Sequence, residues 1–253
     1  MRGRAIVVAV EGASGAGKST VVARAAARFG WVPLAEAYDR LDPRPRLDVR
    51  SDAALARLER TLLEEEARRF AVARAIRARG STVIADTGFL GPLTYSAGLV
   101  ALGTLRPARL ANLLRRADGL RGQGRWGMAD LVVVLRTSPQ VRAARRKRDP
   151  TRHPPALAAR HESVGRLEEA FYRDRLGAER PGYVRSIGAT GPISRVVAAV
   201  GRAVGTARRP SEAPAAARVA LRLLRAVPAP EGRPFVAPAT VKKSPLPPVA
   251  PSR

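Results

Sequence analysis

The chain of 253 residues has no cysteine and only two histidines, which excludes disulfides and argues against a protein-ligated zinc ion. Its formal net charge of +25 would suggest a nucleic-acid partner, but nearly all its basic residues are arginines spread along the whole chain. We therefore attribute the charge to composition and expect no dedicated nucleic-acid groove. No apolar run approaches the roughly 20 residues that a membrane-spanning helix needs, so we expect a cytoplasmic protein.

The first predicted element is a phosphate-binding loop. Gly12 to Ser19 reads G-x-x-x-x-G-K-S, a spacing in which backbone N–H groups surround the phosphates of a nucleotide. In such a loop Lys18 reaches the β and γ oxygens, and the Ser19 hydroxyl holds Mg²⁺. We expect ATP and Mg²⁺ as cofactors, with the nucleotide bound by Gly12, Ala13, Ser14, Gly15, Ala16, Gly17, Lys18, Ser19 and Thr20.

The residues on either side of this loop support the prediction. Residues 5–10 form an apolar, β-branched run typical of a buried strand, and residues 19–29 favour a helix that ends at Gly30. Lys18 is also the only lysine among the first 146 residues, where arginine cannot replace a compact ammonium. The alternative, a glycine-rich turn without a nucleotide, explains none of this context.

Two further predicted strands each end in a carboxylate. Residues 31–35 are followed by Glu36, and residues 81–85 by Asp86. Ligands of open α/β sheets lie beyond the carboxyl ends of the strands, so we expect Glu36 near the γ-phosphate and Asp86 at the magnesium site. Asp86 has an alternative role as the cap of the next helix. Between these strands, the prolines of residues 38–50 predict a loop over the site.

Helices and loops account for the middle of the chain. Ser51 is a suitable N-cap for a long helix over residues 52–79, with an interruption left open. Residues 88–103 indicate a loop and a short helix containing Tyr95, and residues 107–117 a second helix. Residues 118–127 are rich in glycine and arginine and predict a loop, in which we interpret Trp126 as a packing residue.

The fourth predicted strand, residues 130–135, leads into a basic helix. Ser138 and Pro139 begin this helix, which we expect to run through Arg148. Its dense cluster of arginines suits neutralisation of the transferred phosphoryl group, and we assign that role to Arg145 and Arg148. Arg142 or Arg152 are alternatives to Arg145, and most of the cluster could equally be a solvated basic face.

The remaining predicted elements are a helix over residues 161–176, a strand over 183–187 and an amphipathic helix through Val204. Strands that alternate with helices predict an α/β fold, a parallel sheet covered on both faces. We expect this domain to span residues 1–205 and a proline- and arginine-rich, mostly disordered tail to span residues 206–253. Residues 215–227 could form a helix, with Val219, Leu223 and Val227 on its apolar face, that docks on the domain, on a partner or on an anionic surface, in that order.

Together these segments resemble the thymidylate kinase and deoxynucleoside kinase group of P-loop phosphotransferases over residues 4–204. The resemblance lies in the opening V-E-G-A-S-G-A-G-K-S, in Asp86-Thr87-Gly88 followed by Thr94-Tyr95-Ser96-Ala97-Gly98, and in the proline-started arginine helix after strand four. It implies a P-loop NTPase fold, a five-stranded parallel sheet of order 2-3-1-4-5. It also implies that Glu36 accepts the proton of the acceptor hydroxyl and that Tyr95 binds the acceptor.

Two departures bear on the acceptor. Thr87 stands where the family has an arginine, and Ser96 where thymidylate kinases have a glutamine, which argues against thymidine monophosphate itself. Our leading hypothesis is a Mg²⁺·ATP-dependent kinase that transfers the γ-phosphoryl group to a small nucleoside- or nucleotide-like acceptor.

Two other functions stay open. One is a P-loop kinase for another small molecule, such as an antibiotic or a sugar-like metabolite. The other is an ATPase coupled to protein or nucleic acid, with the basic tail as the contact. A GTPase is disfavoured because no N-K-x-D motif occurs. The oligomeric state is open, with a homodimer as one alternative.

Overall fold

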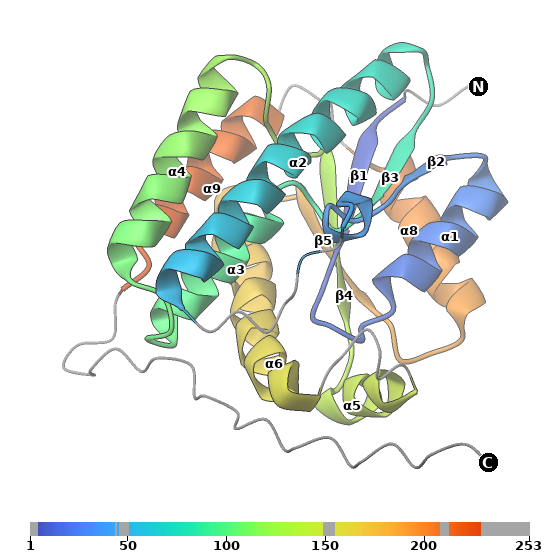
Figure 1. The fold of residues 1–253 in the computed structure, drawn as a ribbon. Coiled ribbons are helices and arrows are strands. Elements are labelled where there is room, and N and C mark those ends of the chain that lie inside the picture. The colour runs from blue at the N-terminus through green and yellow to red at the C-terminus, as the bar shows by residue number, and fades with distance from the viewer. Residues whose placement is uncertain (1–4, 44, 46–50, 149–154, 208–212, 229–253) are drawn as a thin grey trace, which may run out of the picture.

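The computed structural model describes residues 5–43, 45, 51–148, 155–207 and 213–228, and Figure 1 shows their arrangement. Five parallel strands form one sheet of order β2-β3-β1-β4-β5. They are β1 (Val7–Glu11), β2 (Val32–Leu34), β3 (Val83–Asp86), β4 (Leu131–Arg136) and β5 (Val184–Gly188). The predicted α/β fold and strand order are confirmed.

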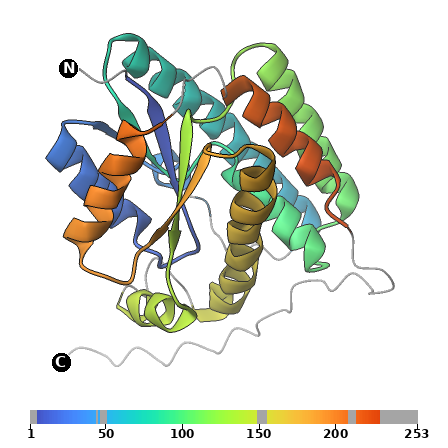
Figure 2. The same cartoon turned by 180° about the vertical axis from the view of Figure 1, so that it is seen from behind.

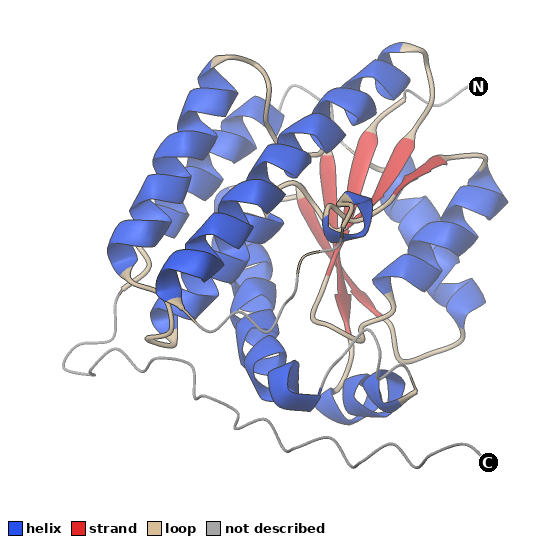
Figure 3. Cartoon of the chain, in the orientation of Figure 1, coloured by secondary structure: helices blue, strands red, loops and turns tan. Residues whose placement is uncertain are grey.

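Helices cover both faces of the sheet, as Figures 1 to 3 show. On one face lie α1 (Lys18–Phe29) and α8 (Ile193–Gly205). On the other lie α2 (Asp52–Ala78), α3 (Gly91–Ala101), α4 (Pro107–Gly122), α6 (Pro155–Ala170) with its π-helical continuation η2 (Phe171–Leu176), and α9 (Ala213–Arg225). Along β1 the side chains alternate between the faces, so Val8 and Val10 join one apolar core while Val7 and Ala9 join the other.

Shorter elements connect these layers. A 3₁₀ turn, η1 (Tyr38–Arg40), follows β2 within the expected loop. The basic helix α5 (Pro139–Lys147) follows β4 and lies at the carboxyl end of the sheet, where Ser138 caps it by accepting from the N–H of Val141. The one-turn α7 (Gly177–Glu179) precedes β5. Within the described ranges, no helix combines the length and apolarity needed to cross a membrane.

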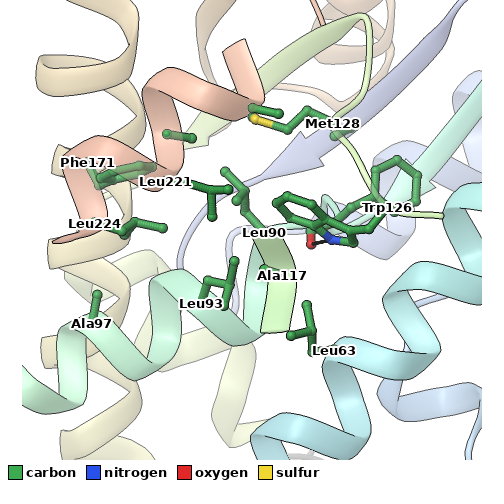
Figure 4. Packing of buried hydrophobic residues seen from close by; sticks show 14 of the residues in the cluster. Leu63, Leu90, Leu93, Ala97, Ala117, Trp126, Met128, Phe171, Leu221 and Leu224 are labelled. Atoms are coloured by element: carbon green, nitrogen blue, oxygen red, sulfur yellow. Dashed lines mark hydrogen bonds between the residues drawn. The ribbon is translucent and has the colours of Figure 1, made fainter. Parts of the chain in front are cut away.

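The helix α9 belongs to the larger core. The residues of α9 buried in this core are Ala216, Ala217, Ala220, Leu221 and Leu224. Figure 4 shows Leu221 and Leu224 near Phe171 of η2, against which α9 packs. Docking on the domain is the option ranked first above, but the buried face is not the expected one of Val219, Leu223 and Val227, which are only partly buried. The packed core therefore extends beyond the boundary expected at residue 205.

Several boundaries differ from expectation. The helix α2 runs for 27 residues without interruption, and the side chain of Ser51 caps it by accepting from Ala54. The prediction of a loop that begins at Asp118 is wrong for the first residues of that range, because α4 continues to Gly122. Asp118 stabilises this extension by pairing with Arg121 one turn later and with Arg225 of α9. The Trp126 side chain is buried, as expected, and donates to the Phe89 carbonyl.

Candidate active site

The phosphate loop connects β1 to α1 and depends on glycine at defined positions. Gly12, Gly15 and Gly17 have φ values of 139°, 82° and 97°, a region that side chains strongly disfavour. A Cβ atom at Gly12 would also lie 2.6 Å from the carbonyl oxygen of Leu135. The backbone turn that the motif predicts therefore requires these glycines sterically.

Cationic side chains cross this loop. The Lys18 Nζ donates to the carbonyl oxygen of Gly12 at 2.8 Å. From α5, Arg145 donates to the carbonyl oxygens of Ala16 at 2.8 Å and Ala189 at 3.0 Å, which ties α5 to the loop. A phosphate group placed in the loop would thus meet Lys18 and Arg145 from two sides.

The other basic residues of α5 differ in their surroundings. Arg142 is buried and donates to Thr137 and Glu162, so it holds α5 in place. Arg146 donates to Ser14 and to Glu162. Arg148 is exposed and does not line the cavity described next, while Arg152 lies outside the described residues.

A cavity of about 680 Å³ extends from the phosphate loop between α2, α3 and α6. It brings together Lys18, Glu36, Tyr95 and Arg145, which the sequence analysis selected from separate segments. Apolar side chains from α2 and α3 form much of its far wall, namely Leu55, Leu58, Leu62 and Pro92. Its size is that of a typical small-molecule site.

Asp86 does not line this cavity. It shares with Ser19 a second hollow on the α1 side of the sheet, because its register opposite Val10 points it to that face. Asp86 is 6% exposed, and its Oδ1 atom has no hydrogen-bond partner among the described residues. A buried carboxylate oxygen left in this way, beside a serine hydroxyl, fits a hard divalent cation. Ser19 and Asp86 are thus the residues that could hold Mg²⁺.

The strand end carrying Asp86 is followed by a strained turn. Thr87 has φ 61°, and its hydroxyl donates to the Asp86 carbonyl at 2.6 Å. The fully buried Arg69 donates to the carbonyl oxygens of Asp86 at 2.9 Å and Thr87 at 3.3 Å. Arg69 also pairs with Glu66, so α2 holds the turn from the core side.

Glu11, at the end of β1, is a site residue that the sequence analysis did not select. Its Oε1 atom accepts from the N–H of Gly88 at 2.8 Å and from the hydroxyl of Tyr172 at 2.7 Å. Burial raises the pKa of Glu11, and these hydrogen bonds and the charge of Lys18 partly offset the rise. Tyr172 lies in the π-helical segment, a local irregularity that is frequent at functional sites. An acid closing a buried strand was the available signal, as for Glu36 and Asp86.

Three further carboxylates were missed because they interrupt the apolar faces of helices. Burial raises the pKa of Glu59 and of Glu66 to about 8, and that of Glu168 to about 7. All three line the cavity. The spacing of Glu59 and Glu66 with Leu55, Leu58 and Leu62 was the signal that could have identified the two α2 carboxylates.

Comparisons with known proteins concern the domain family and the fold that carry this site. The matching family model is described as an AAA domain and covers residues 7–173. A search of curated proteins gives no match. A solved structure of deoxyadenosine kinase from M. mycoides with bound dATP superposes with a TM-score of 0.65 at 15% identity, covering 79% of this chain and 100% of that one.

Two other structures of that M. mycoides kinase superpose less closely. The one with products dCMP and a flexible dCDP has a TM-score of 0.55 at 15% identity, covering 80% of this chain and 100% of that one. The one with bound dCTP has a TM-score of 0.54 at 15% identity, covering 79% and 99%. Identities this low show a shared fold.

Proposed function

Since the chain belongs to the AAA domain family of P-loop proteins, we propose that it is a Mg²⁺·ATP-dependent kinase for a small nucleoside- or nucleotide-like acceptor. The observation that carries the proposal is the single cavity that joins the phosphate loop to Glu36 and Tyr95. A phosphoryl transferase must hold donor and acceptor side by side, with water kept out. The structural likeness to deoxyadenosine kinase supports the same class of reaction.

The donor side has groups suited to charge neutralisation. Lys18 and Arg145 would contact the phosphate oxygens on which negative charge accumulates during transfer. Arg148, at the exposed end of α5, would contribute only if α5 moved closer to the loop. Ser19 and Asp86 would hold Mg²⁺, which when bound polarises the phosphates and screens their charge.

The acceptor side has a candidate general base. Glu36 is partly buried and lines the cavity, and its charge adds to burial, the main cause, in raising the pKa values of Glu66 and Glu168. In the proposed step Glu36 takes the proton of the acceptor hydroxyl, whose oxygen bonds to the γ-phosphorus while the bond to the β–γ bridging oxygen breaks. ADP and the phosphorylated acceptor are the products. Tyr95 would position the acceptor from α3.

The family description favours a second candidate, an ATPase whose hydrolysis is coupled to a protein or nucleic-acid partner. In that case ATP consumption would respond to a polymer rather than to a small acceptor. The cavity of small-molecule size beside the phosphate loop favours the kinase, because a polymer-coupled ATPase has no need of it.

The test is transfer of labelled γ-phosphate from ATP to a panel of nucleosides, deoxynucleosides, their monophosphates, amino sugars and quaternary ammonium alcohols. We expect a labelled product that disappears in Lys18→Ala and persists in Lys147→Ala, which alters an exposed lysine outside the cavity. Acceptor-independent hydrolysis that DNA or RNA stimulates in a salt-sensitive manner would instead support the second candidate.

A further inference from the structure

The part of the cavity remote from the phosphate loop carries an excess of acidic groups. Of the five carboxylates that line the cavity, Glu36, Glu59, Glu66 and Glu168 come from the loop after β2, α2 and α6. Among the lining cations, Lys18 and Arg145 are engaged with carbonyl oxygens of the phosphate loop. On the acceptor side, Arg160 and His161 of α6 also line the cavity, where Arg160 hydrogen-bonds Tyr95 and the His161 ring packs against the Tyr95 ring.

We propose, on the basis of the kinase function above, that the acceptor is an unphosphorylated, hydroxyl-bearing organic molecule with a positive charge, and that Glu59 binds that charge. Glu59 is 3% exposed, lines the cavity, and its Oε2 atom has no hydrogen-bond partner in the described structure. Buried polar atoms are nearly always paired in native proteins, so this oxygen indicates a missing ligand group.

The other two acids of α2 and α6 are better satisfied. Glu66 pairs with the buried Arg69, and Glu168 accepts from the hydroxyl of Thr94 at 2.9 Å. Glu59 is therefore the side chain on the acceptor side with an open acceptor oxygen. A cation that approached this oxygen would gain a charge-assisted hydrogen bond or a close ion pair in a site largely removed from water.

The surroundings of Glu59 determine its ionisation. Charged or titratable groups face it from α6, as Glu168 and Arg160, and from α3, as Tyr95. Burial and the charge of Glu168 raise the pKa of Glu59 to about 8, against a smaller lowering by Arg160. A bound cation would favour the ionised carboxylate, so cation binding should strengthen as the pH rises through about 8.

The walls favour an organic cation over a metal ion. Leu55, Leu58 and Leu62 offer apolar contact, and Tyr95 adds an aromatic ring to the lining, a kind of group that attracts organic cations. No group of three or more acidic or histidine side chains in the described structure is arranged to hold a metal ion. An anionic acceptor such as a nucleoside monophosphate would meet the charge of Glu36 and would raise the pKa values of Glu59, Glu66 and Glu168 further, and it is therefore disfavoured.

The test measures binding of matched probes by calorimetry at a pH of about 8. One pair is choline and its neutral isostere 3,3-dimethyl-1-butanol. The other set is 3-methylcytidine, which is cationic near neutral pH, with cytidine and cytidine 5′-monophosphate. We expect the cationic member of at least one set to bind roughly tenfold or more tightly than its neutral partner. Equal or tighter binding of the neutral or anionic members, or no binding of either cation at millimolar concentration, would overturn the proposal.

The variant Glu59→Gln keeps the shape of the side chain and removes its charge. We expect it to abolish the cation preference, whereas Glu64→Gln, on the same helix where Glu64 pairs with Arg116, should retain it. Choline binding should strengthen between pH of about 6.5 and 9 in the wild type and strengthen less in Glu59→Gln, where only Glu66 and Glu168 still ionise in this range. If Glu59→Gln does not fold, the pH dependence of the wild type still decides, because a flat profile would contradict the proposal.

This experiment separates the acceptor charge from the kinase function. A cation preference without phosphoryl transfer would retain the charge assignment and remove the kinase. Transfer to a neutral nucleoside or a nucleoside monophosphate in preference to any cationic probe would support the kinase function and overturn the charge assignment.

Discussion

The two ends of the cavity are built by different means. The phosphate end is formed mainly by the backbone of one continuous run of residues, in which glycines occupy the positions that need positive φ. The acceptor end is assembled from side chains of the loop after β2 and of α2, α3 and α6, which are far apart in the chain. A short motif can therefore identify the first end, whereas the second depends on how the helices pack.

The largest effect should follow from breaking the phosphate end. Lys18→Ala removes the ammonium that crosses the loop, and we expect phosphoryl transfer to fall by roughly 10³-fold or more. ATP binding should weaken as well. Turnover and nucleotide affinity are measured together, with Lys147→Ala as the control that should leave both intact.

A change at the acceptor end should separate turnover from nucleotide binding. Glu36→Gln should lower turnover by about 10²-fold or more, since a positioned general base contributes 10²–10⁴-fold, and should leave ATP affinity unchanged. Near-normal turnover in this variant would remove Glu36 from the role of base.

The support between the two ends can be tested through stability. Arg69→Met leaves Glu66 without its partner and frees the carbonyl oxygens of Asp86 and Thr87. We expect a loss of about 3 kcal/mol in the free energy of unfolding, measured in urea. Arg68→Met, which changes a residue with a 70% exposed side chain, should cost little, and similar losses for both variants would argue against this role for Arg69.

The smallest expected effect concerns pH. The folded pKa of Glu59 is about 8, above its ordinary value near 4.5, so the folded state holds this proton more tightly. Its contribution to stability is full below about pH 4.5 and is lost as the pH rises through about 8. Relative to Glu59→Gln, the wild type should therefore lose free energy of unfolding between pH of about 5 and 8, measured in urea at each pH. If the free energy of unfolding changed with pH in the same way in both proteins, the raised pKa of Glu59 in the folded state would be contradicted.

The sequence predicted what local rules determine. The loop glycines and the Ser51 and Ser138 caps agree with the structure, and so does the strand order, which the family resemblance implied. The sequence analysis did not identify Glu59, Glu66 and Glu168 as site residues. An acidic residue in an amphipathic helix is expected on the solvent-facing side unless the packing of that helix is known. The buried face of α9 was not predicted for a similar reason. Its alanines contact the core together with Leu221 and Leu224, while Val219 and Val227 lie at the edge of the core.

The central claim is that one cavity holds an ATP donor and a small acceptor together. The most direct test is the rate of ATP consumption by the wild type with and without each acceptor of the panel. We predict that one acceptor raises the rate and becomes labelled in equal amount, and that Lys18→Ala abolishes both signals. ATP hydrolysis at the same rate with every acceptor, with no labelled product, would contradict the claim.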